Sequence, residues 1–213
     1  MPSSPETVLV TGASSGIGRA FVHRFARAGS DCVLLARSEN ALCELADDVT
    51  ATYDVDAHVL PADLSEPDAA AKIDNELGAR DLAVDVLVNN AGFGARGAFA
   101  DLDAQRQVNM IRVNVAALTH LTRFLLPSMR ERGRGGVLNV ASTAGFQPGP
   151  RMTVYYATKA YVLSFSEGLH EEVEGTGVTV SCLAPGPTRT SFADRADMND
   201  AVLFDLGATM APD

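Results

Sequence analysis

The chain has 213 residues, of which 46% are hydrophobic and 21% charged, and its 17 Lys and Arg against 27 Asp and Glu give a net charge of −10. These values predict one ordinary soluble globular domain and argue against a nucleic-acid or anionic-membrane surface. No apolar run is long enough to span a bilayer, the start lacks a signal-peptide pattern, and neither the cysteines nor the histidines have metal-ligand spacing. We therefore expect a cytoplasmic protein without a metal ion.

A glycine-rich turn follows the first predicted strand. The β-branched run 7–10 leads directly into Thr-Gly-Ala-Ser-Ser-Gly-Ile-Gly at 11–18, and a helical pattern then continues to Ala28. This order of strand, turn and helix is the context that a dinucleotide phosphate-binding turn requires. Glycines let the backbone approach a pyrophosphate, and the helix N-terminus offers free N–H groups. A plain tight turn is the structural alternative, but three glycines at this spacing favour a dinucleotide site.

The second predicted strand, 32–36, ends without an acidic residue. In dinucleotide folds an acid here binds the adenosine ribose 2′-hydroxyl, whereas a nearby arginine accommodates a 2′-phosphate. This chain has Ala36 followed by Arg37 and Ser38, which favours NADP(H) over NAD(H). Arg19, early in the first helix, could contribute as well. The alternative is that Arg37 is only a solvated residue at a strand end.

Helical and strand patterns alternate along the rest of the chain. We expect helices at 38–50, 69–77, 102–132 and 153–174, and strands at 57–60, 84–88, 136–141 and 178–183. Such alternation predicts βαβ units and a parallel sheet covered by helices on both faces. The fold class is therefore α/β, a Rossmann-type doubly wound sheet in three layers and a single domain.

Polar residues follow several of these strands. Asp63 and Leu64 come after the third strand, where the acid either caps the next segment or reaches an adenine amino group; the sequence leaves both open. The fourth strand ends in Asn-Asn-Ala-Gly at 89–92. Paired asparagines often only hold neighbouring backbone, whereas Gly92 would let that backbone lie close to a cofactor. Asn114 lies on an apolar helical face and needs a hydrogen-bonding partner.

Tyr155 and Lys159 are four residues apart on the 153–174 helix, so their side chains share one face. A free tyrosine has a pKa near ~10, and a neighbouring ammonium favours the phenolate, which would bring the phenol toward useful acid/base chemistry. Ser142, at the end of the fifth strand, could place a hydroxyl beside the same oxygen. Such a pair alone is more often a solvated surface pair, and the other motifs supply its support.

Together these features resemble the short-chain dehydrogenase/reductase family, in its NADP-preferring bacterial-type oxidoreductase branch. The resemblance covers residues 7–190 and rests on the glycine-rich turn, Asp63, the Asn-Asn-Ala-Gly run, Asn114, Ser142, Tyr155 with Lys159, and Pro185-Gly186. It implies hydride transfer between NADP(H) and a carbonyl/alcohol pair, with the protein supplying position and electrostatics.

The resemblance also implies roles for individual residues. Tyr155 would be the acid/base, Lys159 would lower its pKa and hold the nicotinamide ribose, Ser142 would orient the carbonyl, and Asn114 would hold a water linking Lys159 to solvent. The expected cofactor-binding residues are Gly12, Ser14, Ser15, Gly16, Ile17, Gly18, Arg37, Ser38, Asp63, Leu64, Asn90, Ala91, Gly92, Tyr155, Lys159, Pro185, Gly186 and Thr188. By the same analogy, we expect a homodimer or homotetramer formed through the long helices.

Family members usually continue with a further helix and strand, whereas this chain stops at Asp213. We therefore expect a catalytic domain at 1–190 and a substrate-covering segment at 191–213, apparently truncated. The alternatives to an oxidoreductase are a non-catalytic NADP(H)-binding sensor or scaffold, and an isomerase or dehydratase that uses the cofactor transiently. The substrate cannot be read, because the apolar candidates for its pocket fit core packing equally well: Phe93, Phe99, Phe146, Val154 and Phe192.

Overall fold

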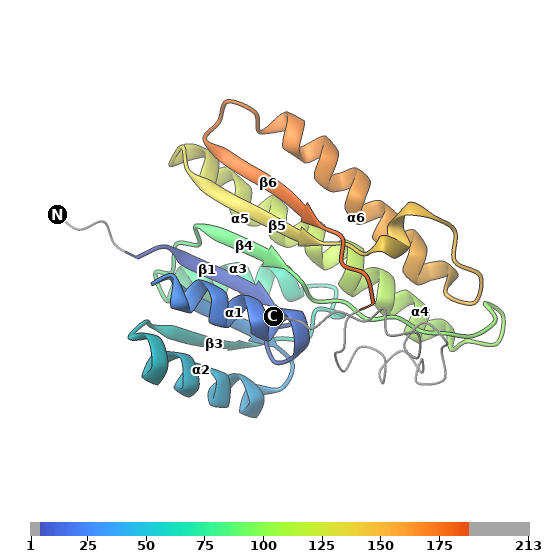
Figure 1. Ribbon diagram of the computed structural model, residues 1–213, viewed down its shortest axis with the longest axis horizontal. Helices are drawn as coiled ribbons and strands as arrows, with labels where there is room; N and C mark the ends of the chain where they lie inside the picture. The colour runs from blue at the N-terminus through green and yellow to red at the C-terminus, as the bar shows by residue number, and fades with distance from the viewer. Residues whose placement is uncertain (1–4, 188–213) are drawn as a thin grey trace.

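The computed structural model of the protein describes residues 5–187. Within them, six parallel strands form one sheet in the order β3-β2-β1-β4-β5-β6, which confirms the predicted doubly wound α/β fold. The strands are β1 (Thr7–Thr11), β2 (Asp31–Ala36), β3 (Ala57–Pro61), β4 (Val86–Asn89), β5 (Gly135–Val140) and β6 (Val178–Leu183) (Figure 1).

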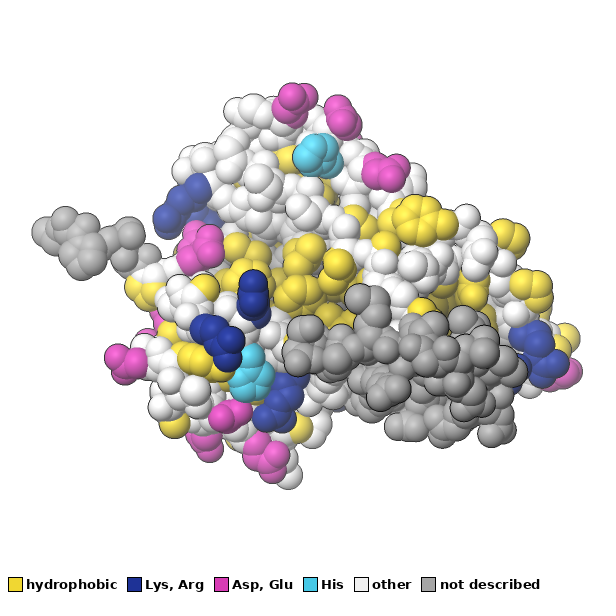
Figure 2. Space-filling view, viewed as in Figure 1, with side chains coloured by type: hydrophobic (Ala, Val, Ile, Leu, Met, Phe, Trp, Pro, Cys, Tyr) yellow, Lys and Arg dark blue, Asp and Glu magenta, His cyan; other side chains and the backbone are white. Residues whose placement is uncertain are grey.

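Helices cover both faces of this sheet. Those in the described chain are α1 (Gly16–Arg27), α2 (Glu39–Tyr53), α3 (Ala69–Ala79), α4 (Ala104–Ile111), η1, a π-helix (Arg112–Ala117), α5 (Leu118–Glu131), η2, a 3₁₀-helix (Thr143–Phe146), and α6 (Thr153–Glu172). Helices α1 and α2 pack on one face, and α3, α5 and α6 pack on the other. In the view of Figure 2, hydrophobic side chains remain visible over β4 and β5.

The core has two layers because the central strands are buried on both faces. Leu42, Leu45 and Val49, the apolar face predicted for the second helix, are each 0% exposed and pack in one layer with residues of β1 and β2. The other layer joins α3, α5 and the opposite side of the same strands. Strands buried on both faces read as continuous apolar runs, which is why the sequence revealed them.

Strand β1 lies between β2 and β4, and this arrangement positions the site. The chain leaves β1 toward α1 on one face and leaves β4 toward α4 and α5 on the other. A crevice therefore forms at the carboxyl ends of these two strands, where doubly wound folds bind their ligands.

The long helix predicted for 102–132 is divided into α4, η1 and α5. The π-helical segment contains Asn114, whose side chain hydrogen-bonds to the loop after β4 and to α6. Such π-bulges occur mostly at functional sites. The apolar pattern of the sequence could not reveal the π-helical segment, because the pattern continues unchanged through its one wider turn.

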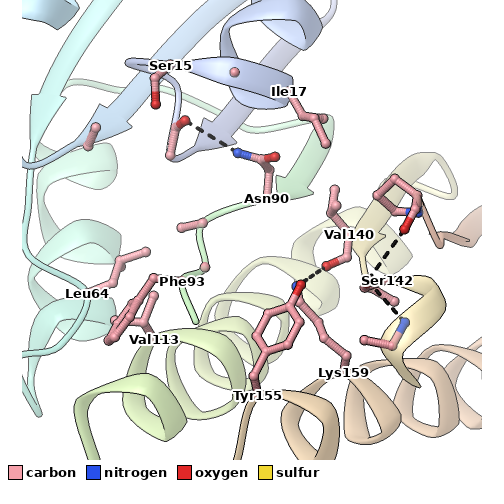
Figure 3. A pocket seen from close by; sticks show the side chains of 18 of the residues that line it. Ser15, Ile17, Leu64, Asn90, Phe93, Val113, Val140, Ser142, Tyr155 and Lys159 are labelled. Atoms are coloured by element: carbon pink, nitrogen blue, oxygen red, sulfur yellow. Dashed lines mark hydrogen bonds between the residues drawn. The ribbon is translucent and has the colours of Figure 1, made fainter. Parts of the chain in front are cut away.

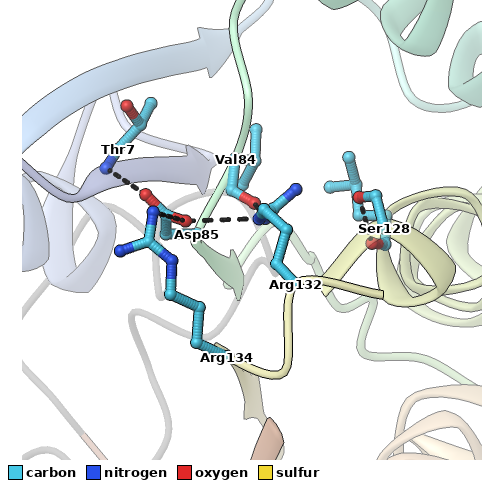
Figure 4. Close-up of polar contacts among 7 residues, drawn as sticks. Thr7, Val84, Asp85, Ser128, Arg132 and Arg134 are labelled. Carbon is cyan, nitrogen blue, oxygen red and sulfur yellow. Dashed lines mark hydrogen bonds and ion pairs between the residues drawn. The ribbon is translucent and has the colours of Figure 1, made fainter. Parts of the chain in front are cut away.

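Strand β4 begins at Val86, two residues later than predicted, and the side chain of Asp85, directly before it, belongs to a polar cluster (Figure 4). Its buried carboxylate accepts a hydrogen bond from the Thr7 backbone N–H at 3.2 Å and pairs with Arg132 and Arg134 at 3.5 Å each. Arg132 also donates to the Val84 carbonyl at 2.7 Å. This cluster joins the start of β1 to the end of α5, at the amino ends of the central strands and opposite the crevice.

Two predictions fall outside the described residues. These are the role of Thr188 and the substrate-covering segment at 191–213. Among the residues that are described, no helix has the length and apolar character needed to cross a membrane.

Candidate functional site

The glycine-rich turn between β1 and α1 depends on glycines that lack space for a side chain. Gly12 has a φ of +67°, which favours glycine. A Cβ on Gly18 would lie 2.2 Å from the Gly12 carbonyl oxygen, so only glycine lets the helix pack onto the turn. The turn residues Gly12, Ser14, Ser15, Gly16 and Ile17 line a cavity of about 440 Å³.

The N-terminus of α1 suits an anionic group. Its first turn contains no acidic residue, and the first backbone N–H groups of a helix have no partner within it. Together with the positive end of the helix dipole, these donors favour phosphate. The structure therefore fits the pyrophosphate of a dinucleotide at this turn.

Arg37 and Ser38 are exposed at the carboxyl end of β2, and both line the same cavity. This is the expected place for the group that distinguishes NADP(H) from NAD(H). Arg19, the second arginine considered, instead pairs with Asp48 of α2 at 3.5 Å and is not among the residues that line the cavity.

Asp63 and Leu64 also line this end of the cavity. The Asp63 carboxylate accepts hydrogen bonds from the backbone N–H of Ser65 at 2.9 Å and from its hydroxyl at 2.8 Å. Burial raises the pKa of Asp63, but these hydrogen bonds and the charge of Arg37 outweigh burial and leave it below its ordinary value. Asp63 thus caps the following segment and is available to the cavity.

Asn90 and Thr11 join the two halves of the crevice. The Asn90 side-chain amide donates to the Thr11 carbonyl at 2.8 Å. The Thr11 hydroxyl donates to the Val88 carbonyl at 3.2 Å and accepts from the backbone N–H groups of Asn90 and Ala91, each at 2.9 Å. Asn90, Ala91 and Gly92 all line the cavity.

Ser142, Tyr155 and Lys159 converge on the cavity from β5 and α6 (Figure 3). Ser142 begins the short η2 helix, where its oxygen accepts a hydrogen bond from Ala144 N–H and its hydroxyl lies 3.4 Å from the Pro185 carbonyl. Lys159 donates from Nζ to the Val140 carbonyl at 2.7 Å. Its Nζ lies 5.9 Å from the centre of the Tyr155 ring.

The pKa of Tyr155 differs from the sequence expectation. Burial raises the pKa of this phenol to about 12, and the hydrogen bond with Ser142 acts in the opposite direction but is weaker. Burial also lowers the pKa of Lys159 to about 8. The net shift is opposite to the expected one, because desolvation of the phenol outweighs the other contributions. The lowering contribution expected from Lys159 stays a prediction.

Asn114 is 2% exposed, and its side chain bonds to the loop after β4 and to α6. Its oxygen accepts from Phe93 N–H at 3.1 Å, and its amide donates to the Phe93 carbonyl at 3.0 Å and to the Thr158 hydroxyl at 3.1 Å. The side chain therefore fastens the loop after β4 to α6. Its expected role in holding a water stays a prediction.

Within the described chain, the structure gathers nearly all of the predicted site residues into one place. Pro185 and Gly186 line the cavity, whereas Asn114 and Gly18 support its wall from behind. Sequence reasoning missed several further residues in and around the cavity. Thr11 and Val140 act through a hydroxyl and a backbone carbonyl, and the wall also includes Gln147, Met152 and Tyr156.

The proposed substrate-pocket candidates are only partly supported. Phe93 lines the cavity, while Phe99 and Phe146 are 64% and 69% exposed and Val154 packs against a small cluster with Met152 and Tyr155. Phe192 lies outside the described residues. A side chain whose contacts come from a loop gives no periodic signal in the sequence. The sequence therefore could not distinguish pocket residues from core residues among these candidates.

Comparison with known proteins identifies relatives along nearly the whole chain. The family model described as short chain dehydrogenase matches residues 6–201. A short chain dehydrogenase of Pseudocercospora fijiensis is 43% identical over 191 residues, covering 88% of this chain and 61% of that protein. The very-long-chain 3-oxoacyl-CoA reductase of Anas platyrhynchos is 37% identical over 182 residues, covering 83% of this chain and 58% of that protein.

A solved structure agrees with these relatives. The short-chain dehydrogenase from Sphingobium yanoikuyae in complex with NADPH is 38% identical, with a TM-score of 0.91 over 98% of this chain and 80% of that chain. This chain spans only 58% to 61% of the length of the two curated relatives.

Proposed function

The chain belongs to the short-chain dehydrogenase family, and from this premise we propose that it is an NADP(H)-dependent oxidoreductase that interconverts a ketone or aldehyde with an alcohol. The observation that carries the proposal is the convergence of Ser142, Tyr155 and Lys159 on the cavity that also contains the glycine-rich turn. When bound, the cofactor supplies or accepts the hydride.

The two halves of the cavity suit the two parts of this reaction. The turn at Gly12–Gly18 and the N-terminus of α1 would hold the pyrophosphate. Arg37 and Ser38 would hold the 2′-phosphate, and Asp63 with Leu64 would flank the adenine. The NADPH complex of the Sphingobium yanoikuyae relative supports this cofactor choice.

Tyr155 would exchange the proton. Its raised pKa keeps the phenol protonated near neutral pH, which is the form that can donate to a carbonyl oxygen as a hydride arrives at the carbon. Ser142 would bind the same oxygen and orient it. For alcohol oxidation the phenolate is needed, and the positive charges of Lys159 and of an oxidised nicotinamide would favour it.

The deciding experiment combines cofactor binding with turnover. We expect calorimetry to detect NADPH binding to the wild-type chain, and carbonyl substrates to be reduced at its expense. The first substrates to test are 3-oxoacyl-CoA thioesters, because a curated relative is named for reducing them. Tyr155→Phe should reduce kcat at least ~100-fold, the usual range for a lost general acid, while NADPH binding remains.

Tyr161→Phe is the matched control, since Tyr161 lies on the same helix and its hydroxyl contacts only Thr119, at 2.8 Å, among the bonds described. Full turnover by Tyr155→Phe would contradict the proposed acid/base. NADPH binding without turnover of any carbonyl by the wild type would instead support the sensor or scaffold alternative.

We also propose that the chain forms a homo-oligomer through α5 and α6. Phe124 on α5 and Tyr161 on α6 are 41% and 37% exposed, and Tyr161 stacks on Phe165 with ring centres 5.7 Å apart. Exposed aromatic groups on neighbouring helices are typical of protein interfaces. Light scattering should give a mass of at least two chains, and Phe124→Glu should reduce it. A monomeric wild type would contradict the proposal.

A further inference from the structure

Four buried polar side chains connect β4, β5, α5 and α6 behind the catalytic half of the site. The Asn89 amide donates to the Asn139 carbonyl oxygen at 2.9 Å and to the Thr122 hydroxyl at 3.0 Å. The Asn139 amide donates in turn to the Ser166 hydroxyl at 2.9 Å. None of these four residues is more than 4% exposed. We call this set the amide network.

The two hydroxyl groups end the network on the helices. Thr122 donates to the Leu118 carbonyl of its own helix at 2.8 Å, and Ser166 donates to the Val162 carbonyl at 2.6 Å. Each hydroxyl therefore both accepts from an asparagine and donates to a helix. Because a buried polar group without a partner is costly, this chain of bonds favours one arrangement of the four elements.

Each strand member of the network lies next to a residue that lines the cavity. Asn89 precedes Asn90, and Asn139 precedes Val140. The pairing of β4 with β5 ends at Asn89 and Asn139, so Val140 is the first residue beyond it. The Val140 carbonyl accepts the hydrogen bond from Lys159 Nζ. On α6, Ser166 lies two helical turns after Lys159 and on the same face.

We propose that Asn89, Thr122, Asn139 and Ser166 are positioning residues, which fix the Val140 carbonyl relative to α6 and thereby hold Lys159 in place. The inference extends the proposed function to the residues behind its lysine. Around the network, the core contains Leu118 and Val162, which are 6% and 0% exposed. Apolar side chains could fill the same space, but they would tolerate small shifts between β5 and α6 that paired amides oppose.

Loss of the network has a measurable consequence at Lys159. A displaced Val140 carbonyl would no longer stabilise the ammonium, so the pKa of Lys159 should fall further below its ordinary value. The other titratable groups that face Lys159 are Tyr155 on α6 and Cys182 on β6. Neither belongs to the network, so a change at Lys159 in a network variant reports on position rather than on a removed charge.

The sequence makes this pKa directly measurable, because it contains only two lysines, Lys72 and Lys159. NMR of protein labelled with ¹³C at the lysine Cε gives one resonance for each, and Lys159→Met assigns them. Thr122→Val and Ser166→Ala each remove one hydroxyl of the network. We expect both to lower the pKa of Lys159 by about half a unit or more, with Lys72 unchanged.

Two variants separate positioning from general loss of stability. Thr122→Ser keeps the hydroxyl and should retain the wild-type titration. Ser128→Ala removes a hydroxyl whose hydrogen bond, among the described residues, goes to the Leu125 carbonyl of its own helix, and it should also leave Lys159 unchanged. An unchanged pKa of Lys159 in both Thr122→Val and Ser166→Ala would overturn the inference, as would an equal shift in Ser128→Ala.

The titration does not require turnover, so it tests the inference independently of the proposed reaction. A shifted Lys159 in a protein that reduces no carbonyl would support the positioning role while contradicting the proposed function. If the wild type is active, the pH profile of kcat should move with the NMR titration in Thr122→Val, and Thr122→Ser should restore it. An active wild type with a fixed Lys159 pKa would contradict the positioning role alone.

Discussion

The buried Lys159 should make the stability of the folded chain depend on pH in a defined window. Burial lowers the pKa of Lys159 from 10.5 to about 8, and the side chain is 6% exposed. Between these two values the unfolded chain holds a proton that the folded protein has released. The free energy of unfolding therefore rises with pH across the window. Below pH 8 and above pH 10.5 this lysine contributes no slope.

The magnitude follows from the size of the window. At about 1.4 kcal/mol per pKa unit, the shift corresponds to about 3 kcal/mol gained between the lower and upper limits. Lys159→Met removes the titrating group and keeps a long unbranched side chain. Any pH-independent effect of the substitution adds a constant, so only the pH-dependent part of the difference from the wild type reports on the titration of the lysine.

Urea unfolding of the wild type and of Lys159→Met from pH 7 to 10.5 measures this difference. A Cys182→Ser background removes the one thiol whose charge acts on Lys159. Lys72→Met is the control, because the Asp68 hydrogen bond raises the pKa of that exposed lysine. The free energy of unfolding of the wild type minus that of Lys159→Met should rise with pH. If this difference stays flat or falls, burial does not lower the pKa of Lys159 and the argument is refuted.

Two other substitutions test separate parts of the structure. Arg37→Ala should weaken NADPH binding about tenfold or more, the value of one charge-assisted hydrogen bond, and leave NADH binding unchanged. Calorimetry measures both affinities, and Arg19→Ala is the matched control. Equal losses of affinity for the two cofactors would show that Arg37 does not distinguish them. Asp85→Ala should lower the free energy of unfolding by about 1–3 kcal/mol, because Thr7 N–H and Arg132 lose a buried acceptor. The exposed Glu76–Arg80 pair provides the comparison, since Glu76→Ala should cost under about 1 kcal/mol, and a similar loss in both variants would contradict the reasoning.

The sequence predicted those features that leave a local pattern. Central strands appear as apolar runs because both of their faces are buried, and Leu42, Leu45 and Val49 revealed the buried face of α2 through helical spacing. The glycine-rich turn was also predictable from the sequence, because a position without space for a Cβ, such as Gly18, requires glycine. Tyr155 and Lys159 share a helix face by spacing alone.

What the sequence could not supply depends on contacts between distant segments. The π-helix at Asn114 follows from bonds to Phe93 and Thr158, which lie in other elements. The sequence identified the Tyr155–Lys159 pair but not its electrostatics, because burial, unlike spacing, is a property of the whole fold. Desolvation then reversed the expected direction of the pKa of Tyr155.

The strand order explains how hydrogen bonds of backbone groups and neutral side chains connect the two halves of the cavity. Placing β1 beside β4 joins the half of the cavity proposed to bind phosphate, which begins after β1, to the half proposed to transfer the proton, supplied by β5 and α6. The Thr11 hydroxyl bonds three backbone groups across that junction. On β4 itself, Asn89 begins the hydrogen bonds that reach α6 through Asn139 and Ser166. A shift of β4 would therefore move the glycine-rich turn and the acceptor of Lys159 together, so one strand sets the positions of both halves.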